Sequence, residues 1–276
     1  MATRLPDYPE TRSADVVETF HGRPVSDPYR WLEDAQSPET RRWTEQQNAL
    51  TESYLESLPG RQRIRRRLEQ LLSIGVLGVP LPARGRYFYL RRDGSQNQPV
   101  LYWRQGVDGA DRTAVDPNTL NPRGTTALDW FFPTLDGRYL AYGLSEDGTE
   151  ESVLSILDVA EGRTLEDKIP RMRAASLAWL PDATGFYYTR YPAPGEVPAG
   201  EEHYHRAIYF HRLGTGWQDD SLVYRPFEKE YWPGVGVSPD GEWLLITVAR
   251  TFDETDLYKV IEGASYTLSV KPDPKL

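Results

Sequence analysis

From Val79 onward, short apolar runs alternate with polar turns, and the pattern repeats along the chain. A glycine followed by an aromatic or aliphatic run occurs at Gly85–Leu90, Gly137–Tyr142, Gly185–Arg190 and Gly241–Ile246. Subtracting glycine positions 85, 137, 185 and 241 in turn gives gaps of 52, 48 and 56 residues. A second run follows each of these, at Leu101–Trp103, Val153–Val159, Ala207–His211 and Leu257–Ile261. Three of the glycines come just after an aspartate-containing turn, as in Asp136-Gly137 and Asp240-Gly241.

A period near 50 residues with about four short strands in each unit is typical of β-propeller blades. The pattern therefore predicts a mainly β fold, a partial β-propeller of about three and a half four-stranded blades, over residues 76–276. A partial propeller leaves sheet faces and strand edges without a neighbouring blade. We expect such a chain to expose an apolar wall and to be prone to pairing with other chains.

The first 75 residues have the spacing of helices instead, and we assign residues 1–75 to an N-terminal helical segment. Ser37 is a good N-cap, and Pro38 suits the first helical position. The apolar residues that then return to one helical face are Trp43, Leu50, Tyr54 and Leu58, before Pro59-Gly60 ends the helix. A second helix is predicted from Ile64, Leu68, Leu71 and Leu72, with Arg61, Arg63, Arg65, Arg66 and Arg67 mostly on its other, solvated side.

The composition supports a mainly β fold and argues against some classes of binding partner. The chain has 17 Tyr, 8 Trp and 8 Phe beside 22 Gly and 22 Pro, as aromatic strands with tight turns require. The net charge of -9 argues against nucleic acid or an anionic membrane as the main partner. The absence of cysteine excludes disulfides and thiolate metal sites. No membrane span is visible and Met1–Glu10 lacks the apolar core of a signal peptide, so a cytoplasmic location is expected.

Catalytic and cofactor motifs are largely missing from these residues. The sequence nearest to a Gly-x-Ser-x-Gly nucleophile elbow is Gly236-Val237-Ser238-Pro239-Asp240, which has aspartate in place of the second glycine and belongs to a blade turn. Gly234-Val235-Gly236 begins like a dinucleotide fingerprint, but the third glycine is not in place. We therefore expect no catalytic residue and no cofactor.

Histidines and acidic doublets are the other candidates for chemistry. His203 and His205 point to one side of an extended segment and could bind a metal with His211, but no third carboxylate ligand is evident and strand histidines usually form hydrogen bonds. The prediction is therefore that no metal is bound. The doublets Glu150-Glu151, Glu201-Glu202 and Asp219-Asp220 could be paired catalytic carboxylates. Because neighbouring strand residues point to opposite faces, solvated loop charge is the better interpretation.

The order of several short motifs resembles the prolyl oligopeptidase family of serine peptidases. The block that carries most of the resemblance is Asp27-Pro28-Tyr29-Arg30-Trp31-Leu32-Glu33-Asp34. The other matching segments, in family order, are Tyr8-Pro9, His21-Gly22, Gln47-Asn48, Gln98–Tyr102, Asp116-Pro117-Asn118, Phe186–Tyr188 and Ile208–Thr215.

The resemblance implies an N-terminal segment and about half of a seven-bladed propeller that admits short peptides to an α/β-hydrolase domain. That domain, which in the family cleaves after proline with a Ser-Asp-His triad, matches nothing in these residues, so we expect no peptidase activity from this chain alone. Glu150 falls where the family often has an acidic residue facing the hydrolase, and we expect it at that interface. Lys259-Val260-Ile261-Glu262-Gly263 follows sooner than in the family and suggests a truncated or partial frame.

Two kinds of partner follow from these interpretations. The first is the missing hydrolase half, with short proline-containing peptides as substrates of the complete enzyme. The alternative is a stand-alone binding module, a half propeller that dimerises with a second copy of itself.

Overall fold

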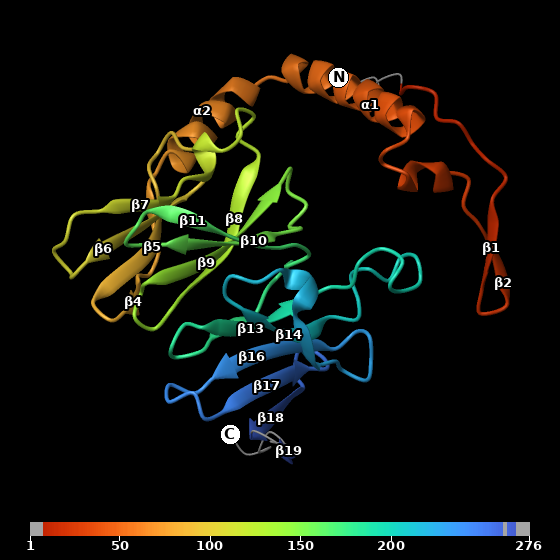
Figure 1. The fold of residues 1–276 in the computed structure, drawn as a ribbon. Coiled ribbons are helices and arrows are strands. Elements are labelled where there is room, and N and C mark those ends of the chain that lie inside the picture. The colour runs from red at the N-terminus through yellow and green to blue at the C-terminus, as the bar shows by residue number, and fades with distance from the viewer. Residues whose placement is uncertain (1–7, 262–263, 269–276) are drawn as a thin grey trace, which may run out of the picture. The chain divides into compact units, whose positions relative to one another are not determined.

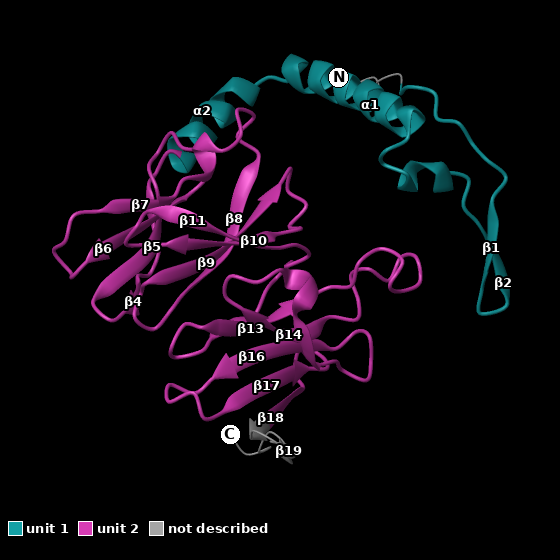
Figure 2. Cartoon of the chain, in the orientation of Figure 1, with its two compact units in different colours: residues 1–72 teal, residues 73–276 magenta. Residues whose placement is uncertain are grey.

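The structure, a computed structural model, describes residues 8–261 and 264–268, and the chain divides into two units, Met1–Leu72 and Ser73–Leu276 (Figure 2). Each unit is described by itself below. Among the described residues, none of the helices combines the length and the apolar composition that crossing a membrane requires.

The first unit begins with a β-hairpin that the sequence pattern did not predict as strands. β1 (Val17–Phe20) pairs antiparallel with β2 (Arg23–Ser26), and His21 and Gly22 both have positive φ in the turn between them. The 3-10 helix η1 (Arg30–Glu33) follows. Arg30 connects it to the hairpin, because its guanidinium donates to Asp27 at 2.7 Å and to Glu18 at 2.9 Å.

Two helices complete this unit, as the sequence predicts. α1 (Pro38–Ser57) has Ser37 as its N-cap, whose hydroxyl oxygen accepts from the Thr40 backbone N–H at 3.1 Å. α2 (Arg61–Leu72) begins directly after Gly60. No residue of α2 is buried, and its apolar side, which includes Ile64, Leu68 and Leu72, is exposed.

The second unit contains four antiparallel sheets that follow one another in chain order, and each is a propeller blade (Figure 1). Blade 1 consists of β3 (Val76–Leu77), β4 (Leu81–Ala83), β5 (Arg86–Arg92), β6 (Val100–Gln105) and β7 (Arg112–Val115), in which β3 and β4 both pair with β5. Blade 2 consists of β8 (Thr126–Pro133), β9 (Tyr139–Glu146), β10 (Val153–Asp158) and β11 (Arg163–Ile169). Blade 3 consists of β12 (Leu177–Trp179), β13 (Gly185–Arg190), β14 (Ala207–Arg212) and β15 (Ser221–Tyr224). Blade 4 consists of β16 (Trp232–Val237), β17 (Leu244–Ala249), β18 (Thr255–Ile261) and β19 (Ala264–Leu268).

The predicted propeller is confirmed, and the fourth sheet has a full set of four strands where a partial blade was expected. Two short 3-10 helices, η2 (Pro117–Thr119) and η3 (Trp217–Asp219), lie in connections. Each of the eight predicted runs overlaps an observed strand, although Gly241–Ile246 shares only its last three residues with β17. Of the segment Lys259–Gly263, residues 262–263 lie outside the described part of the chain.

Each blade buries one face against the next, so the core is divided into three layers. Phe88 and Leu101 of blade 1 pack with Leu140 and Leu157 of blade 2. The layer between blades 2 and 3 is the most aromatic and contains Trp179, Phe186 and Tyr188 beside Ile156 and Ile169. Ile208 of blade 3 meets Ile246 and Val248 of blade 4 in the third layer.

A glycine allows the Trp130 ring to fit into the layer between blades 2 and 3. A Cβ at Gly143 would lie 2.2 Å from the Trp130 ring, so only glycine permits the indole to lie directly on β9. Trp130 Nε1 then donates to the Met172 carbonyl at 3.1 Å, and Trp179 Nε1 donates to the Phe132 carbonyl at 3.0 Å. Both indole N–H groups are therefore satisfied by backbone.

The face of blade 1 that points away from blade 2 is covered by its own side chains. Arg91 stacks on the Tyr102 ring at 4.2 Å and Arg104 on the Tyr89 ring at 4.8 Å. Asp111 accepts from Arg91 at 2.5 Å and also from the Tyr89 hydroxyl. The prediction of an exposed apolar wall is wrong for this face of blade 1, because cationic and phenolic groups cover it.

We predict that the aromatic layer between blades 2 and 3 carries a large share of the stability of this unit. Phe186 is fully buried against Trp179, with ring centroids 4.8 Å apart, so Phe186→Ala should lower the free energy of unfolding by about 3–5 kcal/mol. The control is the same substitution at Phe227, whose side chain is exposed and which should change stability by less than about 0.5 kcal/mol. Denaturant unfolding measures both, and equal effects would contradict this assignment of the core.

Candidate functional site

Charged and aromatic side chains that could take part in binding lie at one rim of the propeller. Because the strands of each blade alternate in direction, the loop between its second and third strands lies at the same rim as the linker from its last strand to the next blade. We call this the linker rim. It comprises residues 93–99, 116–125, 147–152, 170–176, 191–206, 225–231 and 250–254 and the strand ends beside them.

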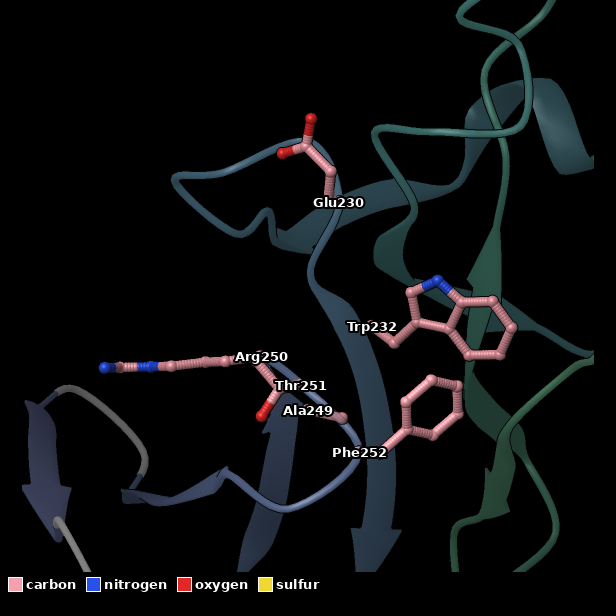
Figure 3. A pocket seen from close by; sticks show the side chains of 6 residues that line it. All are labelled: Glu230, Trp232, Ala249, Arg250, Thr251 and Phe252. Atoms are coloured by element: carbon pink, nitrogen blue, oxygen red, sulfur yellow. The ribbon is translucent and has the colours of Figure 1, made fainter.

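A pocket of about 300 Å³ opens on the linker rim of blade 4 (Figure 3). Trp232, the first residue of β16, and Phe252, in the loop between β17 and β18, place their rings next to each other on one side of it. Trp232 is 53% exposed and Phe252 is fully exposed, so both rings are accessible to a ligand. Glu230 and Arg250 are the charged residues of its lining.

The two charged residues that line this pocket differ in their contacts. Arg250 forms an ion pair with Asp256 at 2.5 Å, so its charge is compensated within blade 4. Glu230 comes from the linker between blades 3 and 4, and in Figure 3 its carboxylate lies apart from the two rings. The pocket thus combines an open aromatic wall with a carboxylate at its margin, and it can bind an apolar group that carries a polar backbone.

Ion pairs connect neighbouring loops across the rest of the rim. Glu150 has positive φ in the loop between β9 and β10, and its carboxylate accepts from Arg173 Nη2 at 2.9 Å. Glu151 lies 3.4 Å from His203 Nδ1, which comes from blade 3. Both acidic residues therefore connect the β9–β10 loop to different parts of the chain, and Glu150 is more than half exposed.

A second cluster on the rim is built around Glu201. Its carboxylate accepts from Lys229 Nζ at 2.7 Å and contacts His205 Nε2 at 2.7 Å. The hydrogen bond from Lys229, followed by that from His205, lowers the pKa of Glu201, so this carboxylate is ionised at neutral pH. Lys229 comes from the linker that leads to Trp232, and the pair holds that linker against the long β13–β14 loop.

Away from the linker rim, His211 is fully buried between two carboxylates. Its Nε2 lies 3.0 Å from Asp167 of blade 2, and its Nδ1 lies 2.8 Å from Asp220 of blade 3. Asp167 also accepts from the Gly214 backbone N–H at 2.7 Å, and Asp220 accepts from the Tyr188 hydroxyl at 2.6 Å. We call Asp167, His211 and Asp220 the inter-blade clasp.

Electrostatics fixes the charge of the clasp. Burial lowers the pKa of His211, but hydrogen bonds to Asp167 and Asp220 and their negative charges outweigh it and raise the pKa to about 9. Burial raises the pKa of Asp167, but the bonds from His211 and the Gly214 N–H reverse this, and the net pKa is lowered. His211 is therefore an imidazolium at neutral pH and donates from both nitrogens.

The structure separates the three histidines that were considered as metal ligands. Both nitrogens of His211 are used within the inter-blade clasp, so it has no lone pair for a metal. His203 and His205 have different carboxylate partners, Glu151 and Glu201. Within residues 8–261 and 264–268, no three metal-binding side chains are grouped together.

Ser238 has the environment of a turn residue. Its Oγ donates to Asp240 and accepts from the Trp243 backbone N–H at 2.9 Å, so the hydroxyl closes a blade turn. This turn lies at the rim opposite to the linker rim. In the described residues, none of the serine hydroxyls is hydrogen-bonded to a histidine, which a serine nucleophile requires as its base.

The prediction that the acidic doublets are solvated loop charge is wrong for Asp220, whereas Asp219 is exposed. The Asp220 side chain is almost fully buried, and it accepts from His211 on β14 and from Tyr188 on β13. Doublet spacing could not show this, because the partners come from other strands. For Glu150-Glu151 the two carboxylates have separate partners and do not form a pair.

Sequence reasoning also missed Trp232 and Phe252. Their only signal is position: Trp232 follows the charged run Glu228-Lys229-Glu230 by two residues, and Phe252 precedes Asp253-Glu254, so each is a large aromatic residue beside or within a polar connection. In a propeller repeat, large aromatic residues are expected to pack in the strands, so sequence alone does not single these two out as binding residues.

Comparisons with known proteins agree on one family. The family model for the prolyl oligopeptidase N-terminal β-propeller domain matches residues 8–265. The prolyl endopeptidase of Elizabethkingia miricola is 33% identical over 91% of this chain, and prolyl oligopeptidase A of Amanita bisporigera is 29% identical over 91%. The chain spans 36% and 37% of the length of these two relatives.

Solved structures give the same result for the fold. A structure from a study of two prolyl endopeptidases has a TM-score of 0.86 at 33% identity and covers 94% of this chain and 39% of its own. Prolyl oligopeptidase B of Galerina marginata, bound to a 35mer hydrolysis and macrocyclization substrate, has a TM-score of 0.78 at 26% identity. That match covers 97% of this chain and 42% of the Galerina enzyme.

We predict that the inter-blade clasp makes stability depend on pH on the alkaline side. The pKa of His211 is raised from about 6.5 to about 9, so its contribution is fully present below pH 6.5 and is lost as pH rises through about 9. His211→Gln should lower the free energy of unfolding by about 3–5 kcal/mol at pH 6, because two buried carboxylates lose their cation. This difference from the native chain should shrink steadily between pH 6.5 and 9.

Denaturant unfolding at a series of pH values measures this effect, with His203→Gln as the control. The His203 side chain is exposed and should contribute less than about 1 kcal/mol at any pH. A His211→Gln effect that does not change between pH 6 and pH 10 would show that the imidazole is neutral in the folded chain.

Proposed function

The chain belongs to the prolyl oligopeptidase family, and from this we propose that its 276 residues are the N-terminal segment and about half of the gating propeller of a peptidase that cleaves short peptides after proline. The observation that carries the proposal is the linker rim, where an open aromatic pocket and a row of charged loops face away from the packed blades. A surface of this composition suits contact with a second domain and with peptide.

We assign the hydrolytic chemistry to residues outside this portion. Amide cleavage by this class of enzyme needs an activated serine, an oriented histidine and an oxyanion hole. None of these is present as a motif in the 276 residues, and His211, the buried histidine, is bound by carboxylates on both sides. The proposed role of this portion is to admit, orient and shield the peptide.

Glu150 keeps its proposed role as a residue of the hydrolase interface. It is exposed on the linker rim, and Arg173 holds its carboxylate at 2.9 Å. An ion pair at a rim tunes orientation and association rate more than affinity, because water screens it. We therefore expect Glu150 to align the two domains and not to touch the reacting atoms.

The pocket between Trp232 and Phe252 is our candidate for peptide contact. Aromatic side chains bind prolyl rings and apolar side chains through their flat faces, and they lose little conformational entropy when they do so. Glu230 at the margin can accept a hydrogen bond from a peptide N–H. The pocket would bind a substrate side chain near the proline and leave the bond to be cleaved to the hydrolase domain.

We expect the purified chain to show no hydrolysis of a proline-linked chromogenic dipeptide. A chimera in which these residues replace the matching part of the Elizabethkingia miricola prolyl endopeptidase should cleave it. In that chimera, Phe252→Ala should raise KM about fivefold or more through loss of apolar contact, whereas Phe227→Ala, an exposed phenylalanine of the same rim outside the pocket, should not. Turnover by the chain alone, or equal effects of both substitutions, would count against the proposal.

Self-association is the second candidate, and the free face of blade 4 favours it. Leu245 and Ala249 alternate along β17 with Ile246 and Val248, which pack on blade 3, so they lie on the opposite face and are half-exposed. The polar cover on the outer face of blade 1 argues against a second copy as its partner. We expect a monomer by light scattering at micromolar concentration, and a particle of twice the mass would favour the half-propeller dimer.

A further inference from the structure

An arginine lies buried beneath the aromatic pocket. Arg206, directly before β14, is 4% exposed, and its Nη2 donates to the Ala174 carbonyl at 2.6 Å and to Thr189 Oγ1 at 2.6 Å. Thr189 is the register partner of Ile208, which packs on blade 4. Arg206 therefore lies on the side of blade 3 that faces blade 4.

The positive charge of Arg206 is met by aromatic rings. Its guanidinium carbon lies 5.5 Å from the centre of the Trp232 ring and 5.8 Å from that of Tyr191. Among the described residues, no carboxylate is within ion-pair distance of it, and its Nε has no hydrogen-bond partner. Burial lowers the pKa of Arg206, but a guanidinium still keeps its proton at neutral pH.

Burying a cation between two blades without a carboxylate partner has a large desolvation free-energy cost. An aliphatic side chain would pack there without the desolvation cost. What the guanidinium adds is orientation: it is planar, its two hydrogen bonds fix it to blade 3 and to the linker that precedes blade 3, and it lies over the indole of blade 4. A cation–π contact is strengthened when the cation is desolvated, and Arg206 is 4% exposed although the Trp232 ring is half-exposed.

We propose that Arg206 is a positioning residue for the peptide pocket, which holds the Trp232 ring in the orientation that receives the substrate side chain. This inference rests on the proposed role of the Trp232–Phe252 pocket. Arg206 does not line the pocket and acts only through Trp232.

The chain offers a matched control in Arg190. It is also buried, it also stacks on aromatic rings, at 4.2 Å from Tyr209 and 4.7 Å from Trp217, and it belongs to the same blade. These rings pack in the layer between blades 2 and 3, on the opposite side of the blade from Trp232. Arg190→Lys and Arg206→Lys therefore make the same chemical change on opposite faces of blade 3.

The first measurement is the indole N–H signal of Trp232 in a ¹H–¹⁵N spectrum of the 276-residue chain, assigned by its disappearance in Trp232→Phe. We expect Arg206→Lys to shift or broaden this signal and to leave the other tryptophan signals in place. Arg190→Lys should leave the Trp232 signal unchanged. Arg206→Met, which keeps an unbranched apolar stem but removes the charged guanidinium, should act like Arg206→Lys. An unchanged Trp232 signal in both Arg206 variants would overturn the proposal.

The second measurement is the affinity of the chain for acetyl-Phe-Gly-Pro-amide, followed by the same spectra. Arg206→Lys should weaken binding about tenfold, because lysine lacks the planar group that holds the ring, and Arg190→Lys should weaken it by less than twofold. In a Trp232→Ala background, Arg206→Lys should have no further effect, because its influence passes through the missing ring. A further loss in that background would show that Arg206 acts on its own.

The two hypotheses fail in different ways. If Trp232→Ala leaves the affinity for this peptide unchanged, the pocket is not the peptide site, and the Trp232 signal alone decides whether Arg206 positions the ring. If Trp232→Ala weakens binding but Arg206→Lys does not, the pocket stands and the positioning role is lost.

Discussion

A four-stranded antiparallel sheet has two broad faces, and the need to cover both of them determines the rest of this chain. Three aromatic and aliphatic layers do so between successive blades, and the middle one also contains a buried imidazolium held by two carboxylates. Apolar contacts alone would tolerate sliding of one blade over the next, because they have little directionality. The inter-blade clasp adds direction, since Asp167 comes from blade 2 while His211 and Asp220 come from blade 3.

Because the blades are held in this way, the loops at the linker rim lie next to particular residues of the neighbouring blade. Trp232 and Phe252 belong to different connections of blade 4, yet they form one wall of a pocket. Arg206 reaches that wall from blade 3, and Lys229 holds the linker that leads to it. The proposed function therefore depends on contacts between blades as much as on the residues of the pocket.

The fold could be predicted from sequence because its signals are local and repeated. Ser37 and Gly60 mark the helix ends, and the glycine-aromatic runs recur at nearly constant spacing, so each blade confirms the next. The hairpin β1–β2 has no such repeat, and its turn residues His21-Gly22 stood out only as a segment that matches the family. Side-chain roles were less accessible. His211 and Asp167 are 44 residues apart, and nothing in either neighbourhood indicates that both are buried in one cluster.

The polar outer face of blade 1 affects how the chain behaves while it is being synthesised. A ribosome completes the first blade before any later blade exists, so both faces of this sheet are in water until blade 2 covers the apolar one. Arginines stacked on tyrosines, with Asp111 between them, give that face charge and hydrogen-bonding groups in place of a flat apolar surface. On this face, nascent chains on neighbouring ribosomes would find little apolar surface to adhere to. The stacking therefore limits the apolar surface of the newly made sheet to the single face that blade 2 covers next.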